Sequence, residues 1–398
     1  MEIKISEDEE IIREGLANII VPKLTKYKRI NGVVEPAWMP VFYNPDAVIS
    51  RDLTTLFLKS VYNNRGFFFI DLLGGTGVRG VRITLETGGH GIINDIDARA
   101  YYYIRKNIYI NNLDDKVEAF NHEANSLLNN MVLSSITVDY IDIDPYGSPI
   151  PYIDSAFKPL SKNSFLGITA TDTAPLMCSH SHKALRRYWF RCLHVDFEKE
   201  LGVRILLANI AMRGAALDIE VRPVLSLVYR HFIRVFLETR RSSRGSYENL
   251  NKCLGYLWFC PNTLERGFSR SVEEAGHNTC LDGSKPMIGD RIWICNINEE
   301  EKIKNMIDLS RDMNWISART IKILNMIKEE SCINDPYIRV DKLCSLLGIN
   351  MPKLSDLVKT LREIGIRAAR THMDPRAIRI KDNFKVLYDV LRGMKKDK

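Results

Sequence analysis

Short apolar runs alternate with amphipathic stretches along the first half of the chain. Five of these runs have the length of buried strands: 67–72, 91–94, 117–120, 138–143 and 165–170. Apolar residues at helical spacing separate them, as in Ala98–Ile110, and another helix is expected from about Ser50. This alternation predicts a doubly wound, mostly parallel α/β sheet of Rossmann-like type, which binds ligands at the carboxyl ends of its strands.

The pattern changes after about residue 225. Residues 255–295 are rich in Gly, Cys and aromatic residues and show no clear periodicity. Helical patterns then return at 316–330, 340–347 and 354–364, and a short apolar run follows them at 377–380. Three short helices before such a run resemble a winged helix. We predict three parts: a lead-in segment 1–60 that packs on the central domain, a ligand-binding domain 61–240, and a smaller C-terminal α+β domain 241–398, winged-helix-like from about 314.

Composition and charge are those of a globular protein with a basic tail. The 398 residues are 45% hydrophobic and 26% charged, with a net charge of +7. From Met351 onward the chain holds thirteen Lys and Arg against six Asp and Glu, so the tail carries the whole excess. This excess fits either contact with a polyanion or a solvated basic helix.

The sequence predicts a cytoplasmic protein with no membrane association. No signal peptide or long apolar stretch is found, and the most apolar segment, 205–221, is interrupted by charged residues. The eight cysteines are scattered, which predicts reduced thiols rather than a disulfide framework.

A glycine-rich loop, residues 74–80, follows the first strand. Its spacing, Gly75-x-Gly77-x-x-Gly80, matches the dinucleotide fingerprint, so a NAD-dependent oxidoreductase is one interpretation. However, Asp71 before the glycines suits an ammonium group, and Arg79 within the loop suits a carboxylate. S-adenosylmethionine carries both groups, and we therefore expect this cofactor to be bound by Asp71, Gly75, Gly77 and Arg79, unless the loop is only a tight turn.

Asp95 ends the second strand, where a carboxylate can accept both hydrogen bonds of a ribose diol. The alternative role is capping of the next helix, which Asp97 also suits. We predict that Asp95 binds the ribose of the cofactor.

The segment Asp144-Pro145-Tyr146-Gly147 follows the fourth strand and faces the same edge of the sheet. An exocyclic amine on a nucleobase is a poor nucleophile and must be held with its N–H groups on acceptors. Asp144 and the Pro145 carbonyl supply two acceptors, and Tyr146 supplies a face for stacking. We predict a catalytic role for these three residues, although the same sequence also forms ordinary turns.

Further short motifs accompany these: Glu14-Gly15, Phe42-Tyr43-Asn44-Pro45, Arg51-Asp52, Thr169-Ala170-Thr171-Asp172 and Arg370-Thr371-His372-Met373-Asp374-Pro375. Together with the glycine loop and the motifs at Asp95 and Asp144, they resemble the tRNA (guanine-26) N2-dimethyltransferases of archaea and eukaryotes over nearly the whole chain. The resemblance implies transfer of one or two methyl groups from S-adenosyl-L-methionine to N2 of a guanine in tRNA. It also implies catalysis by Asp144 and cofactor contacts from Arg51, Arg79, Asp95, Glu123 and Ala124.

The chain departs from that family in three places. Glu123 stands where the family usually has Asp, and Tyr146 stands where Phe is common. The family often has two Cys-x-x-Cys pairs for zinc, whereas this chain offers Cys260, His277 and Cys280, with Cys253 or a water as a fourth ligand. We predict free thiols and no metal.

Two other interpretations stay open. An enzyme that methylates another amino group, such as adenine N6 or a guanine in rRNA, would share the Asp-Pro-Tyr-Gly segment. A non-catalytic RNA-binding protein could keep a decayed methyltransferase fold, but Arg79, Asp95 and Asp144 are intact. We expect an enzyme that has tRNA as its partner and needs no obligate protein partner.

Overall fold

The computed structural model describes residues 5–63, 65–381 and 384–394. Its main sheet has seven strands in the order β5-β4-β3-β6-β7-β9-β8. The neighbours from β5 to β7 are parallel. All five predicted strands are confirmed, with the bounds β3 Phe68–Asp71, β4 His90–Asn94, β5 Val117–Phe120, β6 Val138–Ile143 and β7 Leu160–Ala170. The predicted α/β class is therefore correct.

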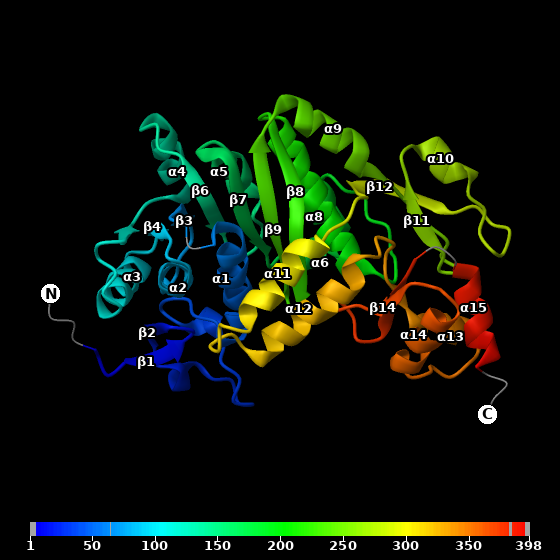
Figure 1. Cartoon of the computed structure of the whole chain (residues 1–398), viewed down its shortest axis with the longest axis horizontal. Helices are drawn as coiled ribbons and strands as arrows, with labels where there is room; N and C mark the ends of the chain where they lie inside the picture. The colour runs from blue at the N-terminus through cyan, green and yellow to red at the C-terminus, as the bar shows by residue number, and fades with distance from the viewer. Residues whose placement is uncertain (1–4, 64, 382–383, 395–398) are drawn as a thin grey trace. The chain divides into compact units, whose positions relative to one another are not determined.

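Helices cover both faces of the parallel strands: α1 Val48–Tyr62, α2 Val78–Thr87, α3 Ala98–Ile110, α4 Ala124–Leu133 and α5 Ile150–Phe157. Helix α2 packs against α1 and α3, and α4 packs against α5. Figure 1 shows α4 and α5 on the side of the strands opposite α1 and α2. Burial on both faces explains the mostly apolar sequences of the inner strands, whereas the edge strand β5 leaves Glu118 exposed.

Two compact units are built from non-consecutive segments. The first comprises Met1–Thr169, Phe236–Arg241 and Lys304–Lys322, and the second comprises Ala170–Val235, Ser242–Ile303 and Ile323–Lys398. The predicted domains, 1–60, 61–240 and 241–398, are consecutive instead. The division into three consecutive parts stays a prediction.

The lead-in segment begins with an antiparallel hairpin and continues through three short 3-10 helices: β1 Glu9–Glu14, β2 Ala17–Pro22, η1 Leu24–Tyr27, η2 Pro36–Trp38 and η3 Pro45–Ala47. The side chain of Asn107 on α3 accepts a hydrogen bond from Ile20 N (2.7 Å) and donates one to Ile20 O (3.0 Å). Ile20 also packs with Val41, Ala100 and Tyr103. The hairpin is thus fixed to α3 by polar and apolar contacts.

The second unit contains two three-stranded antiparallel sheets, β11-β10-β12 and β13-β15-β14. Their strands are β10 Leu254–Phe259, β11 Arg266–Ser269, β12 Met287–Trp293, β13 Ile338–Arg339, β14 Ala368–Arg370 and β15 Ala377–Ile380. Its helices are α6 Thr173–Leu176, α7 Ser181–Tyr188, α8 Glu198–Ala215, α9 Ser243–Cys253, α10 Val272–His277, α13 Val340–Leu347, α14 Leu354–Glu363 and α15 Phe384–Gly393. Its strand β8 is Ile219–Tyr229, and three elements are divided between the units: β9 Phe232–Arg241, α11 Glu300–Ser310 and α12 Ala318–Ser331. The predicted helices of the tail are present, and its winged-helix character stays a prediction.

The apolar segment 205–221 forms most of α8 and the start of β8. Helix α8 also buries the charged pair Glu200 and Arg204. Among the described residues, no helix combines the length and apolar composition needed to cross a membrane.

The motif at Arg370–Pro375 has a structural role through His372. Its Nε2 accepts a hydrogen bond from Val228 N (3.2 Å), and its Nδ1 contacts the buried carboxylate of Glu330 on α12. Arg379 on β15 donates to the same carboxylate (2.6 Å). The motif therefore ties β8, α12 and β15 together inside the second unit.

The prediction that all cysteines are reduced is wrong. Cys253 is bonded to Cys295 and Cys260 to Cys280, and Cys178, Cys192, Cys332 and Cys344 are free. Pairing of β10 with β12 places Leu254 opposite Trp293, which brings the flanking cysteines together. Because residues 255–295 show no periodicity, this pairing was not visible in the sequence.

Candidate active site

The glycine loop turns tightly from β3 into α2. Gly75 and Gly77 have left-handed backbone conformations, with φ of 56° and 79°. A Cβ on Gly75 would lie 3.0 Å from Phe42 O, and one on Gly80 would lie 2.4 Å from Ile93 Cγ1. The first two glycines are therefore needed for the turn, and the third is needed for the packing of α2 on β4.

Asp71 lies beneath this loop and is 2% exposed. Its Oδ2 accepts a hydrogen bond from Gly80 N (3.0 Å). Burial and the neighbouring Asp142 raise the pKa of Asp71 to about 7, against the opposing effect of Arg79. The carboxylate supports the loop from inside, and its contact with the cofactor stays a prediction.

Asp95 follows β4 and contacts the loop directly. Its Oδ2 accepts a hydrogen bond from Gly75 N (2.8 Å), and its Oδ1 accepts one from Asp97 N (2.9 Å). Burial raises the pKa of Asp95. The cap of α3 is Asp97, which accepts from Arg99 N (2.8 Å), so Asp95 is not needed for capping.

Asn94 braces the carboxyl ends of three strands. This fully buried amide donates to Leu72 O and to His122 O, both at 3.0 Å, and accepts from His122 N at 3.0 Å. It thereby links the ends of β3, β4 and β5. Sequence reasoning assigned it no role, although a polar amide at the end of an apolar strand was the available signal.

Glu123 follows β5 and caps α4. Its carboxylate accepts hydrogen bonds from Asn125 N (3.0 Å) and Ser126 N (2.8 Å). The backbone hydrogen bond from Asn125 is the main reason that its pKa is lowered. Ala124 is buried as the first residue of α4. Cofactor contacts of Glu123 and Ala124 stay predictions.

Arg79 joins the glycine loop to the end of β6. Its guanidinium pairs with Asp142 (3.2 Å) and with Asp144, and it donates to Thr54 Oγ1 (2.9 Å) and Ser50 Oγ (3.3 Å). Burial works against the charged form, but the two carboxylates outweigh it and raise the pKa of Arg79. The predicted cofactor residue and the predicted catalytic residue are thus in direct contact.

Tyr146 is exposed beside this ion pair. Pro145 is buried, whereas Tyr146 is 70% exposed. Its ring lies edge-on to that of Phe42, with 5.0 Å between centroids. The Asp144 side chain is 27% exposed. A partly exposed carboxylate near two exposed rings suits a flat, polar heterocycle. Sequence reasoning gave Phe42 no such role.

Arg51 lies in a buried ionic network on α1. It donates to both carboxylate oxygens of Glu14 (2.6 and 2.7 Å) and to Asn44 O (3.0 Å). Tyr43 also donates to Glu14 (2.8 Å), and Arg82 donates to it from α2 (2.9 Å). Arg51 is 4% exposed. The structure therefore gives Arg51 a structural role, and its cofactor contact stays a prediction.

We expect this network to make the free energy of unfolding fall at acid pH. Burial alone would raise the pKa of Glu14, but Arg51 and Arg82 lower it to about 2 from the ordinary 4.5. Its contribution of about 3 kcal/mol is therefore complete above pH 4.5 and lost as the pH falls towards 2. The check is the free energy of unfolding between pH 6 and pH 3. Glu14→Gln should flatten this dependence, whereas Glu118→Gln at an exposed site should not. An equal slope in both variants would contradict the assignment.

The three residues considered as zinc ligands, Cys260, His277 and Cys280, do not form one cluster. Among the described residues, the group of potential ligands is Cys260, Glu265 and Cys280, whose ligand atoms lie within 4.8 Å of one another, and His277 is not part of it. Both sulfurs are held in a disulfide. Because zinc binds thiolates, this group does not fit zinc in the disulfide state.

Comparison with known proteins gives a consistent result. The model of a family described as N2,N2-dimethylguanosine tRNA methyltransferase matches residues 15–392. A curated relative named tRNA (guanine(26)-N(2))-dimethyltransferase, from Sulfolobus acidocaldarius, is 33% identical over 392 residues and 97% of each chain. A relative of the same name from Methanobrevibacter smithii is 32% identical over 389 residues, covering 96% of this chain and 97% of its own.

A solved structure is also similar over nearly the whole chain. It is Trm1 from Pyrococcus horikoshii in complex with S-adenosyl-L-methionine, with a TM-score of 0.82 and 27% identity. The match covers 96% of this chain and 99% of that one.

Proposed function

The chain belongs to the N2,N2-dimethylguanosine tRNA methyltransferase family, and from this premise we propose that Asp144, Pro145 and Tyr146 hold the target guanine. The protein is an enzyme that uses S-adenosyl-L-methionine to methylate the exocyclic N2 of guanine in tRNA. Family membership rules out the oxidoreductase interpretation of the glycine loop. The names of the relatives support position 26 and two methyl groups, and we propose both for this chain.

The observation that carries the residue assignment is the Asp144 carboxylate, held by Arg79 near the exposed rings of Tyr146 and Phe42. In this proposal the rings hold the base flat, Asp144 accepts one N–H of the amine, and the Pro145 carbonyl accepts the other. The amine nitrogen becomes positive as its new bond to carbon forms, and Asp144 then accepts its proton. S-adenosylmethionine, when bound, supplies the methyl group.

The carboxyl ends of β3, β4 and β5 fit that cofactor. The left-handed glycines 75 and 77 turn the chain tightly from β3 into α2, and the part-buried Asp95 beside this turn is an acceptor suited to a ribose diol. We propose that the cofactor is held by Arg51, Asp71, Gly75, Gly77, Arg79, Asp95, Glu123 and Ala124.

Asp95→Ala should weaken cofactor binding by tenfold or more, because a hydrogen bond to a charged group contributes roughly 1.5–3 kcal/mol. Calorimetric titration with S-adenosylmethionine measures this effect. Asp97→Ala is the matched control, since the Asp97 side chain caps α3 and pairs with exposed Arg99, and its loss should cost about 1 kcal/mol of stability with little change in affinity. Unchanged affinity in Asp95→Ala would reject the ribose assignment.

Transfer of a labelled methyl group to unmodified tRNA, followed by nucleoside analysis, tests the function itself. The expected product is N2,N2-dimethylguanosine at position 26. Label in adenine, or in rRNA but not tRNA, would favour the alternative substrates. No transfer to any RNA despite cofactor binding would favour a relict fold.

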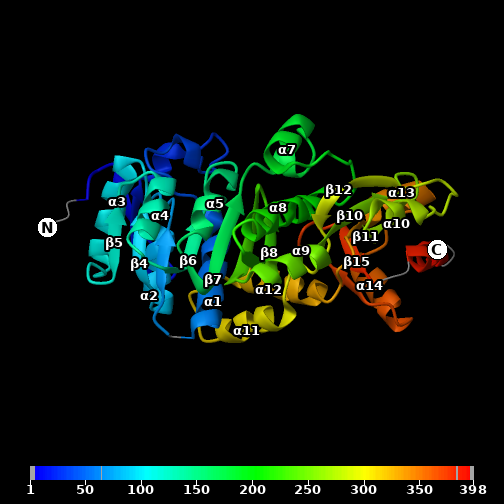
Figure 2. The ribbon, with the colours of Figure 1, turned by 90° about the horizontal axis from the view of Figure 1, so that it is seen from above.

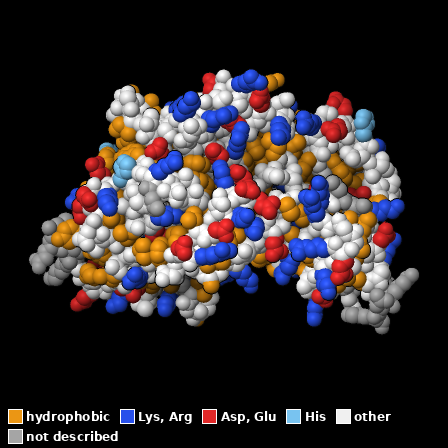
Figure 3. Space-filling view, in the orientation of Figure 1, with side chains coloured by type: hydrophobic (Ala, Val, Ile, Leu, Met, Phe, Trp, Pro, Cys, Tyr) orange, Lys and Arg blue, Asp and Glu red, His pale blue; other side chains and the backbone are white. Residues whose placement is uncertain are grey.

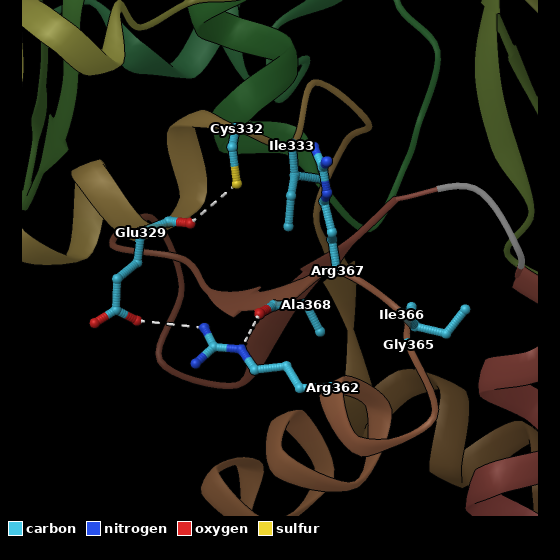
Figure 4. A pocket seen from close by; sticks show the side chains of 8 residues that line it. All are labelled: Glu329, Cys332, Ile333, Arg362, Gly365, Ile366, Arg367 and Ala368. Carbon is cyan, nitrogen blue, oxygen red and sulfur yellow. Dashed lines mark hydrogen bonds and ion pairs between the residues drawn. The ribbon is translucent and has the colours of Figure 1, made fainter.

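We propose that residues 241–398 bind tRNA, because the excess positive charge lies in the tail. On the face drawn in Figure 3, Lys and Arg are intermingled with Asp and Glu, so that face shows no uniform basic patch. Figure 4 shows a pocket of the second unit lined by Arg362 and Arg367. Both arginines are exposed, but Arg362 pairs with Glu329 (3.6 Å) and donates to Ala368 O (2.8 Å), whereas among the described residues Arg367 has no ion-pair partner. Arg367 is therefore the cation of this pocket best placed for a phosphate.

Action in the cytoplasm without an obligate protein partner is part of the same proposal. Two disulfides are unusual for cytosolic proteins outside hyperthermophiles, so cell fractionation and analysis of purified complexes are direct tests.

A further inference from the structure

The α7 segment, defined as residues 173–195, carries a concentration of basic residues with no acidic residue among them. It contains four cations and three histidines: Lys183, Arg186, Arg187, Arg191, His180, His182 and His194. The whole chain has 56 basic and 49 acidic residues. The local charge therefore differs clearly from the near balance of the rest.

Helix α7 has an inner face and an exposed cationic face. Ala184 and Tyr188 are buried, whereas His182, Lys183 and Arg186 are exposed. In the described part of the chain, no carboxylate forms an ion pair with the side chain of Lys183 or Arg186. Within residues 5–63, 65–381 and 384–394, these two charges are therefore not neutralised by an ion pair.

The helix is firmly held at its C-terminal end. Asp172 accepts hydrogen bonds from Arg187 (2.9 Å) and from Tyr188 Oη (2.7 Å). Asn209 on α8 donates to Tyr188 O (2.7 Å). Figure 2 shows α7 standing out from α8 at the upper edge of the view. A preorganised projecting helix loses little conformational entropy when it binds a partner.

Trp189 ends this helix in a left-handed conformation, with φ of 52°, and is 58% exposed. The Arg213 guanidinium lies 5.2 Å from the centre of the indole ring. Leu185, one turn earlier, is also exposed. An exposed indole on the same helix as exposed cations is typical of surfaces that bind nucleic acid, since cations contact phosphates and the ring stacks on a base.

We propose that the α7 segment is a tRNA-binding surface, in which Lys183 and Arg186 contact backbone phosphates and Trp189 stacks on an unpaired base. The proposal rests on the proposed function, which supplies tRNA as the partner. The positive charge of the α7 segment is complementary to a polyanion. The exposed indole favours a nucleic acid with accessible bases over an anionic lipid surface.

The test is binding of unmodified tRNA by the full chain at several salt concentrations. Lys183→Glu/Arg186→Glu should weaken binding about tenfold or more near 0.1 M salt. It should also reduce the slope of log K against log salt by about 1.4–1.8, for two lost phosphate contacts. Arg105→Glu/Lys116→Glu changes the net charge equally at exposed sites of the first unit and should keep the slope. Trp189→Ala should weaken binding about fivefold to hundredfold, and Trp189→Phe should retain most of it.

Equal affinity and slope in the α7 and control variants would overturn the inference. The inference would also be overturned if the α7 variant lost binding to anionic phospholipid vesicles but still bound tRNA normally. Cofactor affinity should be unchanged in every variant. If the wild type methylates guanine N2 while the α7 variants bind tRNA normally, only this inference fails, whereas a wild type that methylates no tRNA refutes the proposed function.

Discussion

Asp144→Asn should lower methyl transfer to tRNA by about 10² or more while leaving S-adenosylmethionine affinity much less changed. Asparagine keeps the size of the side chain but cannot take the proton that the amine loses. Arg79 keeps its other carboxylate partner, Asp142, so the glycine loop should remain in place. Single-turnover rates with bound tRNA and cofactor titration measure the two effects separately.

Asp142→Asn is the matched control on the same strand. Asp142 is fully buried, pairs with Arg79 and accepts a hydrogen bond from Tyr140. Its replacement should lower stability more than Asp144→Asn does, and should affect chemistry less in the molecules that remain folded. If Asp144→Asn retains near-normal turnover, Asp-Pro-Tyr-Gly is only a turn and the catalytic assignment is wrong.

Arg82→Met should destabilise the first unit by about 3–5 kcal/mol, the usual cost of removing one partner of a buried ion pair. Arg82 is fully buried and donates to Glu14 (2.9 Å), Asp52 (2.7 Å) and Glu86 (2.7 Å). Methionine fills a similar volume but leaves these carboxylates without a shared cation. Urea unfolding, followed by a probe in the first unit, measures the loss.

Arg99→Met provides the comparison, because Arg99 pairs with Asp97 at the surface, where the side chains are 67% and 38% exposed. Exposed pairs contribute about 0–1 kcal/mol. If Arg82→Met lowered the free energy of unfolding by as little as Arg99→Met, the buried network would not be stabilising.

The parallel part of the fold was predictable because its inner strands are largely buried and periodic helices alternate with its strands. The antiparallel sheet β11-β10-β12 was not. In β10, buried and half-buried residues alternate within a segment rich in Gly and aromatic residues, which hides the boundaries of the strands. The same segment hid the pairing of Cys253 with Cys295, which depends on a register between strands far apart in sequence.

The sequence could indicate which residue types lie at the strand ends of the candidate site. It could not indicate which of these side chains contact one another. Asp71 and Arg79 were expected to face a ligand, yet Asp71 supports the loop through Gly80 and Arg79 pairs with Asp144. Glu14 shows the limit most clearly, since it meets Arg51 across 37 residues of sequence. Such contacts are decided by tertiary packing, and no local pattern encodes them.

The two disulfides form one covalent ring inside another, because Cys260 and Cys280 both lie between Cys253 and Cys295 in the chain. A protease that cuts one peptide bond anywhere between Cys253 and Cys295 therefore opens the backbone without releasing a fragment. The nicked chain should migrate as a single species in a denaturing gel without thiol, and should separate into two pieces once thiol is added. A cut outside these rings releases its fragment under both conditions.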